Sequence, residues 1–433
     1  MRLKGYQMRI VFLSHHFPPE VNALASRTYD HCRHWVRAGH EVTVVACTPN
    51  HPRGRPYPGY RNRFWQTEVV DGIRVIRIWT FLAANQGVVL RTLNHVCYLL
   101  MVALVAPWLP RADVVISSSP PLFSGLAGYG VSRIKRAPWV LEVRDLWPEA
   151  IRAVGAVRNR WLIRCLEGVE GWAYRTAERV VTVTRSFMVH IAGRGVPARE
   201  ITVITNGADL ELFDSPHRDP NLEEKLGLQD KFVVGYLGTL GMAHRLETLM
   251  DAAEMLRNAP EIRILIVGDG AEYDRLHEMQ RRLGLDNVIM IDQQPKERMP
   301  HLWGLCDVAI ATMRKAPLFK TMIPAKIFEA LAMYRPVILG FEGESREIVE
   351  GAGCGIAVEP ESAAEMAAAI RYMAAHRDEA REMGERGHTL VSEYYDRRLL
   401  AQRFAVLLEE LVSSDRSSYS GTEVPPSRIA PRG

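Results

Sequence analysis

Short apolar runs alternate with amphipathic stretches along most of the chain, and this order is repeated in two successive series. Each run is almost continuously apolar, which is typical of strands buried on both faces of a parallel sheet. The stretches between the runs carry apolar residues at helical spacing, so helices are expected to cover the sheets. The strands are expected at 10–13, 41–46, 113–117, 139–143, 180–184 and 201–204, then at 232–237, 262–267, 288–291, 307–311 and 337–339.

Between the second and third strands of the first series, two further apolar segments flank Asp71-Gly72. A turn of this type between alternating segments predicts a β-hairpin. The first series is therefore expected to contain one antiparallel pair of strands.

A polar segment at 210–229 separates the two series and predicts an interdomain linker. At 433 residues the chain is also too long for one ordinary core. We therefore expect an α/β protein with two doubly wound, Rossmann-like domains that face each other across a cleft. The expected parts are domains 1–205 and 206–395, a helix at 396–412 that packs back on the first domain, and a disordered tail at 413–433.

Composition narrows the class of protein. Hydrophobic residues make up 47% of the chain, charged residues 24%, and the net charge of +4 comes without a long basic run. These values favour a soluble enzyme and give no case for nucleic-acid binding. The six cysteines are scattered singly and no signal peptide is evident at the start, which favours reduced thiols and a cytoplasmic location.

The longest apolar stretch, 96–109, is too short to span a bilayer and is interrupted by Pro107. It is either a buried core helix or a helix that lies at a membrane surface. The loop 52–63 carries Arg53, Arg55, Arg61 and Arg63 among aromatic residues. Such a loop suits an acceptor phosphate or lipid headgroups, and a solvated loop is the alternative.

The segment 323–340 predicts a short helix, a turn and a buried strand. Pro324 opens the helix, and Lys326 and Glu329 lie three residues apart on one of its faces. The helix N-terminus and Lys326 would offset phosphate charge, while Glu329 could accept hydrogen bonds from ribose hydroxyls. The alternative is a surface salt bridge on an ordinary amphipathic helix.

Two loops of the second series suit a diphosphate. Gly238-Thr239-Leu240-Gly241 follows a strand and precedes His244 and Arg245, so backbone could approach the phosphates while Arg245 binds them. Gly268-Asp269-Gly270 repeats the pattern after the next strand, where a plain turn explains it equally well.

Loops of the first series also carry candidate groups. Glu20, Asn22 and Ala23 lie between the first strand and the first helix, where a ligand could approach backbone N–H groups. Asp145 follows the strand at 139–143 and could orient a hydroxyl or act as a base. A cap on the next segment is the equal alternative for Asp145.

These motifs together resemble the retaining glycosyltransferases of family 4, which have the GT-B architecture. The resemblance runs from about Met8 to about Leu411, and its most specific stretches are 142–149 (EVRDLWPE), 238–241 (GTLG) and 324–329 (PAKIFE). The segments around Asp145 and Glu329 look like the subgroup that adds deoxyhexosamines such as N-acetylfucosamine during O-antigen or capsule assembly.

The resemblance implies transfer of a sugar from a nucleoside diphosphate such as UDP, with retention at the anomeric carbon and with no metal or other cofactor. It implies an acceptor side in the first domain and a donor site in the second. The implied catalytic residues are Asp145, Arg245 and Lys326; the donor-binding residues are Glu329, Gly238, Thr239, Gly241, His244, Thr321, Pro324, Gly268 and Gln294; and the acceptor-side residues are Glu20, Asn22, Ala23 and Arg144.

The chain departs from the family pattern at several of these positions. Thr321 stands where the family has the first carboxylate of a Glu-x7-Glu motif, and Thr239 and His244 stand where many members have Arg and Lys. Arg144 replaces a His, and Asn22-Ala23 replaces a glycine pair. These changes favour a divergent donor or acceptor, or lost activity.

The sequence thus predicts a cytoplasmic transferase that acts on a lipid-linked or other glycan acceptor, with peripheral attachment to the inner membrane left open. Two alternatives stay open as well. One is a UDP-sugar 2-epimerase of GT-B shape, and the other is a non-catalytic partner in a polysaccharide assembly complex.

Overall fold

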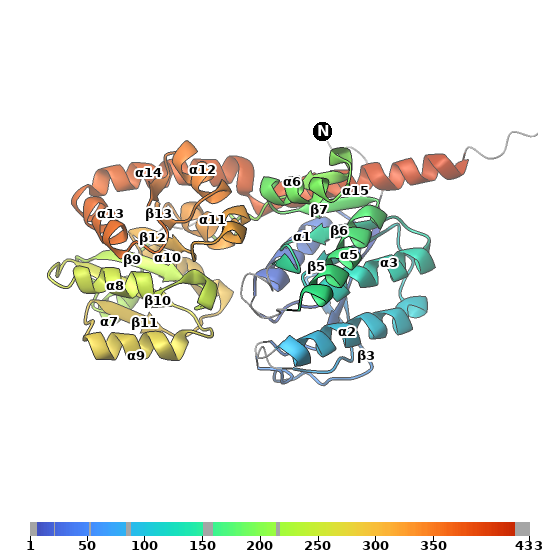
Figure 1. The fold of residues 1–433 in the computed structure, drawn as a ribbon, viewed down its shortest axis with the longest axis horizontal. Helices are drawn as coiled ribbons and strands as arrows, with labels where there is room; N and C mark the ends of the chain where they lie inside the picture. The colour runs from blue at the N-terminus through green and yellow to red at the C-terminus, as the bar shows by residue number, and fades with distance from the viewer. Residues whose placement is uncertain are drawn as a thin grey trace, which may run out of the picture.

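The chain folds into two α/β domains that lie side by side and are joined by a crossover and a long C-terminal helix (Figure 1). The computed structural model describes residues 7–20, 22–51, 53–83, 88–149, 159–213 and 217–420. Each domain is built around its own parallel sheet, which confirms the predicted pair of Rossmann-like domains.

The first sheet has eight strands in the order β3-β4-β2-β1-β5-β6-β7-β8. All neighbours are parallel except β3 and β4, which form the hairpin predicted at Asp71-Gly72. The strands are β1 (Arg9–Leu13), β2 (Glu41–Cys47), β3 (Trp65–Val70), β4 (Ile73–Ile78), β5 (Val114–Ser119), β6 (Trp139–Val143), β7 (Arg179–Thr182) and β8 (Ile201–Val203).

The second sheet has six parallel strands in the order β11-β10-β9-β12-β13-β14. Five were predicted from their apolar runs, whereas the short edge strand β14 was not. The strands are β9 (Phe232–Leu237), β10 (Ile262–Val267), β11 (Val288–Ile291), β12 (Val308–Thr312), β13 (Val337–Gly340) and β14 (Gly355–Ala357).

Helices cover both faces of the first sheet, because successive side chains of each strand point to opposite faces. Ile10 and Phe12 face α1 and α15, while Val11 and Leu13 face α2 and α3. The helices of this half are α1 (Ala23–Arg37), α2 (Val88–Val105), α3 (Leu122–Lys135), α5 (Arg160–Thr176) and α6 (Arg185–Gly193), with short helical turns η1 (Ala106–Trp108) and η2 (Ala198–Glu200).

The second sheet is covered in the same way, with α8 and α13 on one face and α10 and α11 on the other. The helices are α7 (Pro220–Lys225), α8 (Glu247–Met255), α9 (Tyr273–Leu283), α10 (Met299–Leu305), α11 (Ala325–Ala332), α12 (Glu344–Gly351), α13 (Ala363–Ala375), α14 (Arg377–Leu390) and α15 (Arg397–Ser420), with turns η3 (Met242–His244), η4 (Lys296–Arg298), η5 (Pro317–Thr321) and η6 (Val391–Tyr395).

The last helix, α15, leaves the second domain and packs against α1 of the first (Figure 1). Trp35 Nε1 donates to the Ala401 carbonyl at 2.9 Å, and the Trp35 ring meets Phe404 edge to face. The structure differs from the expected tail, because α15 continues to Ser420. Residues 413–420 contain no Gly or Pro that would end a helix. The rest of the expected tail, 421–433, lies outside the described residues.

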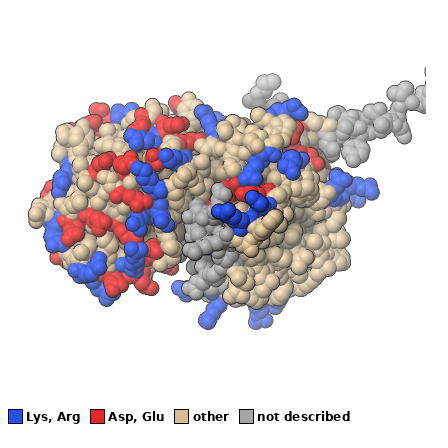
Figure 2. Space-filling model, viewed as in Figure 1, with Lys and Arg blue, Asp and Glu red and all other residues tan. Residues whose placement is uncertain are grey.

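The surfaces of the two domains differ in charge (Figure 2). On the face shown, acidic and basic side chains are mixed over the second domain. Over α2, α3 and α5 of the first domain, the same view shows a broad area with few charged side chains.

Candidate active site

A cavity of about 330 Å³ opens between the two domains, where strand-end loops of the second sheet face the start of α1. The wall from the second domain is formed by the loops after β9, β10 and β11 and by the first turns of α11. The opposite wall is formed by α1, the crossover after β8 and the start of α15. The predicted site residues that line the cavity are Asn22, Ala23, Gly238, Thr239, His244, Gly268, Gln294, Pro324, Lys326 and Glu329.

Lys326 is the most unusual group of the cavity. Its ammonium is buried and has no hydrogen-bond partner among the described residues. It lies 3.7 Å from the centroid of the Tyr236 ring, and a Cβ at Gly238 would lie 3.1 Å from Nζ. Burial lowers the pKa of Lys326 to about 7, although the Glu329 carboxylate acts in the opposite direction. A buried cation without a hydrogen-bond partner is costly even beside an aromatic ring, so the site is suited to receive an anion.

Two glycine loops meet next to this ammonium. A Cβ at Gly268 would lie 1.9 Å from the Gly238 carbonyl oxygen, so only glycine lets the loops after β9 and β10 approach this closely. Thr239 lines the cavity, whereas Gly241 lies just outside it at the start of η3. A ligand in the cavity therefore meets no side chain at Gly238 or Gly268 and can approach the backbone there, as predicted.

His244 is neutral at physiological pH. Burial and the nearby Lys326 lower its pKa to about 3. It lines the cavity beside Lys326 but adds no positive charge to it. The cationic part of this wall therefore depends on lysines rather than on His244.

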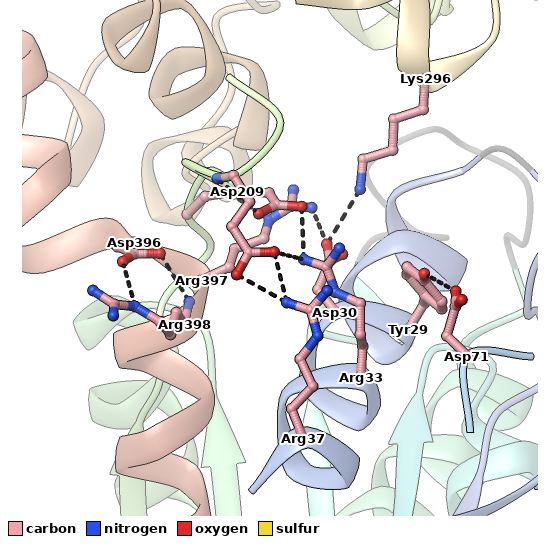
Figure 3. A network of polar contacts seen from close by, with 12 residues as sticks. Tyr29, Asp30, Arg33, Arg37, Asp71, Asp209, Lys296, Asp396, Arg397 and Arg398 are labelled. Atoms are coloured by element: carbon pink, nitrogen blue, oxygen red, sulfur yellow. Dashed lines mark hydrogen bonds and ion pairs between the residues drawn. The ribbon is translucent and has the colours of Figure 1, made fainter. Parts of the chain in front are cut away.

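Glu329 lies one turn after Lys326 and faces Arg397 of α15. The distance from Glu329 Oε1 to Arg397 Nη2 is 3.5 Å. Arg397 is buried, donates from Nε to the Gly207 carbonyl at 2.8 Å, and forms an ion pair with Asp30 (Figure 3). Arg397 thus holds the Glu329 carboxylate from the side of the first domain.

Asp30 connects the two domains across the cavity. Besides Arg397, its carboxylate accepts from Lys296 Nζ at 3.3 Å, and Lys296 comes from η4 of the second domain (Figure 3). Burial raises the pKa of Asp30, but Arg397, Lys296 and Arg33 outweigh burial and hold it below its usual value. Asp30, Lys296 and Arg397 were not predicted, because no local motif marks them and their partners are distant in sequence.

Besides Gly241, two residues predicted for the donor, Arg245 and Thr321, do not line the cavity. Arg245 has a left-handed backbone (φ 51°) that ends η3, and its side chain pairs with Glu247 at 3.4 Å and Glu361 at 3.5 Å. Thr321 ends η5, and its hydroxyl donates to the Leu318 carbonyl at 2.6 Å. Arg245 was expected to contact the diphosphate and Thr321 the donor. In this structure neither side chain lies in the wall of the cavity.

Two residues predicted for the acceptor side, Glu20 and Arg144, instead bind backbone groups of the protein itself. Glu20 is buried and accepts from the backbone N–H groups of Asn50 and His51, each at 2.8 Å. Arg144 donates to the carbonyls of Ala23 and Leu24 at 2.6 and 3.0 Å. Glu20 therefore fixes the loop after β2, and Arg144 fixes the first turn of α1.

Asn22 and Ala23, in contrast, line the cavity at the start of α1. Asn22 Oδ1 accepts from the Ala25 N–H at 2.8 Å and so caps this helix. This hydrogen bond fixes the N-terminus of α1, where the cavity wall from the first domain begins.

Asp145 follows β6 and does not line the cavity. One of its carboxylate oxygens is buried without a hydrogen-bond partner in the described part of the chain. Burial raises the pKa of Asp145 to about 7, and Glu149 adds to the increase. Such a carboxyl group exchanges a proton near neutrality, which suits the base predicted here but does not place it against a substrate.

One group of side chains outside the cavity has the composition of a metal site. Glu149, Glu170 and His190 offer ligand atoms within 4.8 Å of one another. Arg194 lies 2.6 Å from Glu149 and already supplies a positive charge there. None of the three lines the cavity, so this group offers no ligands to an ion bound with a diphosphate.

Comparison with known proteins identifies the two halves separately. Residues 22–207 match the glycosyl transferase 4-like domain, and residues 218–389 match the glycosyl transferases group 1 domain. The chain is a glycosyltransferase built of these two domains. The match boundary coincides with the crossover between the two sheets, so both domains of this glycosyltransferase carry the family signature.

One similar protein is the "Putative colanic acid biosynthesis glycosyl transferase WcaI" of Escherichia coli (strain K12). It is 24% identical over 394 residues, which is 88% of this chain and 96% of WcaI. WcaI is named as a transferase, so the epimerase alternative gains no support from this similarity.

Two solved structures share the fold. Sucrose-phosphate synthase from Thermosynechococcus elongatus aligns with a TM-score of 0.75 at 18% identity and covers 94% of this chain and 100% of its own. HepE of Anabaena in complex with UDP aligns with a TM-score of 0.67 at 21% identity and covers 93% and 100%. At these identities the structures establish the GT-B fold of this glycosyltransferase.

Proposed function

We propose that this glycosyltransferase transfers a sugar from UDP, with retention at the anomeric carbon and without a metal ion, to a lipid-linked glycan. The sugar we propose is an N-acetylated deoxyhexosamine such as N-acetylfucosamine. The reaction takes place at the cytoplasmic face of the inner membrane and contributes to a surface polysaccharide.

The observation that carries this proposal is the buried ammonium of Lys326 in the wall of the cavity, which has no hydrogen-bond partner among the described residues. A diphosphate bound beside Gly238 and Gly268 would supply the missing negative charge. Departure of the sugar leaves additional charge on the diphosphate, and a cation already fixed at that position stabilises the transition state most. The diphosphate then needs no metal ion, because Lys326 provides the positive charge.

Glu329 supports a nucleotide in the same cavity. Its carboxylate is held 3.5 Å from Arg397 and is one turn from Lys326. A carboxylate in this position accepts hydrogen bonds from the two ribose hydroxyls while the diphosphate reaches Lys326. UDP is the nucleotide we favour, since the structural relative HepE has been solved with UDP.

The acceptor and the stereochemistry are supported by similarity to other proteins. The resemblance to retaining enzymes supports retention, and the likeness to WcaI, named for colanic acid biosynthesis, supports a surface polysaccharide. The role of Asp145 toward the acceptor hydroxyl stays a prediction. Its raised pKa is the supporting observation.

The first test is calorimetric titration with UDP, GDP and a set of UDP-sugars, with and without a chelator. We expect UDP to bind more tightly than GDP, and we expect the chelator to leave the affinity unchanged. Failure of every nucleotide to bind would contradict the proposal and favour a non-catalytic partner.

The second test is turnover with the tightest-binding donor and a polyprenyl diphosphate-linked sugar. Proton NMR of the product should show the anomeric configuration of the donor. Inversion, or formation of an epimer of the donor without an acceptor, would contradict the proposed reaction.

A further inference from the structure

Three neighbouring helices of the first domain present apolar side chains to the outside. α2 packs beside α3, and α3 packs beside α5, on the face of the sheet opposite α1 and α15. Figure 2 shows a broad area with few charged side chains in this region. The exposed large apolar residues of the layer are Val89, Leu90, Leu93, Leu100, Leu104, Ile134, Trp161, Leu162, Val169 and Trp172, with Trp108 just after α2.

α2 has two apolar faces with different roles. Tyr98, Val102 and Val105 point inward and belong to the core of the domain. Val89, Leu93, Leu100 and Leu104 follow one another at helical spacing on the outward face, and Val89 is 80% exposed. No charged residue occurs between Arg91 and Arg111. The outward face is therefore an apolar stripe along most of the helix.

Helix α2 is long enough to raise the question of a membrane span. The segment Val89–Trp108 is 20 residues long with a mean hydropathy of 1.7, and by length and composition it is apolar enough to cross a bilayer. Its inward face, however, packs on the sheet and on α3. The helix can meet a bilayer only with its outward face, which means lying on the membrane rather than crossing it.

The rim of the layer carries the residues expected at a bilayer surface. Trp161 is 74% exposed and Trp108 is 69% exposed, and tryptophan is favoured at the boundary between headgroups and acyl chains. Neither α2 nor α3 contains an acidic residue. The exposed arginines around the layer are Arg111, Arg133, Arg136, Arg160 and Arg164. This rim has the charge that attracts anionic phospholipids.

The position of α2 connects this layer with the edge of the sheet where the cavity opens. The His95 ring of α2 lies 5.1 Å from the ring of His15, which follows β1. We propose that the outer surface of α2, α3 and α5 lies on an anionic phospholipid bilayer, with the apolar side chains inserted and the arginines at the headgroups. The inference rests on the proposed function, because a lipid-linked acceptor would then be presented beside the active site.

The test is co-sedimentation of the full chain with vesicles of phosphatidylcholine alone and of phosphatidylcholine mixed with phosphatidylglycerol. We expect binding to the mixed vesicles that weakens as salt is added. The triple variant Leu93→Gln, Leu100→Gln, Leu104→Gln should bind at least about tenfold more weakly, because it loses three inserted side chains. Arg111→Gln with Arg164→Gln should lower binding to the mixed vesicles and leave the weak binding to phosphatidylcholine unchanged.

Met255→Gln on α8 is the matched control, since Met255 is also an exposed apolar residue but belongs to the second domain. Nucleotide affinity and melting temperature should be the same in all variants. Absence of the wild type from both vesicle pellets, or equal binding by the triple variant, would overturn the proposal. An oligomeric wild type together with a monomeric triple variant would also overturn the proposal, because a second copy of the chain would then cover the apolar surface. Nucleotide binding is measured separately, so failure of the membrane surface and failure of the donor site are distinguishable.

Discussion

The first wall of the cavity, from the first domain, and the second wall, from the second domain, differ in whether their cationic side chains are all paired. On the first wall, Arg27 donates to Glu142 and to the carbonyls of Ile204 and Thr205, and Asp30 forms ion pairs with Arg397 and Lys296. On the second wall, the Lys326 ammonium is buried without a hydrogen-bond partner among the described residues.

This difference separates structural charge from charge that is available to a ligand. Ion pairs of the first wall hold α1 against α15 and the second domain, so they are satisfied before any ligand arrives. The second wall has a buried cation with space in front of it. The free energy that the fold loses at Lys326 is recovered only when an anion binds, which is the arrangement expected of a diphosphate site.

Replacement of Lys326 should have the largest effect on affinity. Lys326→Met is expected to weaken the binding of UDP by at least about a hundredfold and the binding of uridine by less than about threefold, because only UDP contacts the ammonium. Calorimetric titration of both ligands measures the contrast. Arg245→Ala is the control, since Arg245 pairs with Glu247 and Glu361 and should leave UDP affinity within about twofold. Equal losses for UDP and uridine would place the diphosphate elsewhere.

Replacement of Glu329 should affect the ribose rather than the phosphates. Glu329→Ala is expected to weaken the binding of UDP by about thirtyfold, which corresponds to the free energy of hydrogen bonds to a charged group. The wild type should also prefer UDP to 2′-deoxy-UDP, and the variant should lose this preference. Glu347→Ala, on an exposed turn of α12, is the control. A variant that still distinguishes the two nucleotides would remove the ribose contact of Glu329.

Replacement of Arg397 should disturb both walls. Arg397→Ala leaves the buried Asp30 carboxylate without its main partner, so we expect a loss of about 3 kcal/mol in the free energy of unfolding. UDP affinity should fall by about fivefold, because Glu329 loses the group that holds it. Arg398→Ala, one residue away on the exposed side of α15, should change neither quantity. If Arg397→Ala has the same free energy of unfolding as the wild type, the interdomain ion pairs do not stabilise the fold.

Binding of UDP should be accompanied by proton uptake. Burial places the pKa of Lys326 near 7 in the free protein, so at pH 8 most molecules carry a neutral amine. A bound diphosphate favours the charged form, and about one proton should be taken up at pH 8. UDP affinity should fall as the pH rises above 7. Calorimetry in buffers of different ionisation enthalpy measures the uptake, which should vanish in Lys326→Met.

The smallest expected effect is a gain in stability. Without nucleotide, Lys326→Met should raise the melting temperature by about 2–4 °C at pH 6, because it removes a buried unpartnered charge. The native pKa lies below the unfolded value, so wild-type stability rises with pH between about 7 and the unfolded pKa near 10. The advantage of the variant should fade over this range in thermal melts. A variant less stable than the wild type at pH 6 would contradict the comparison of the walls.

The sequence predicts the fold well where the signal is local. The continuous apolar runs identified most strands of both sheets, and Asp71-Gly72 marked the hairpin. Lys326 and Glu329 were also found from local spacing, since three residues along one helix fix their common face.

The residues that the sequence misses are those defined by contacts between distant segments. Asp30 and Arg397 are 367 residues apart and meet only because α15 returns to the first domain. Arg245 lies outside the cavity for a different reason. Its left-handed backbone turns the side chain toward Glu247 and Glu361, and nothing in the spacing of the loop reveals that turn.

The most direct measurement of the central claim is a crystal structure of the protein with UDP bound. The account predicts a diphosphate oxygen within hydrogen-bond distance of Lys326 Nζ and the ribose hydroxyls on the Glu329 carboxylate. UDP bound away from Lys326, with the ammonium still unpartnered, would contradict it.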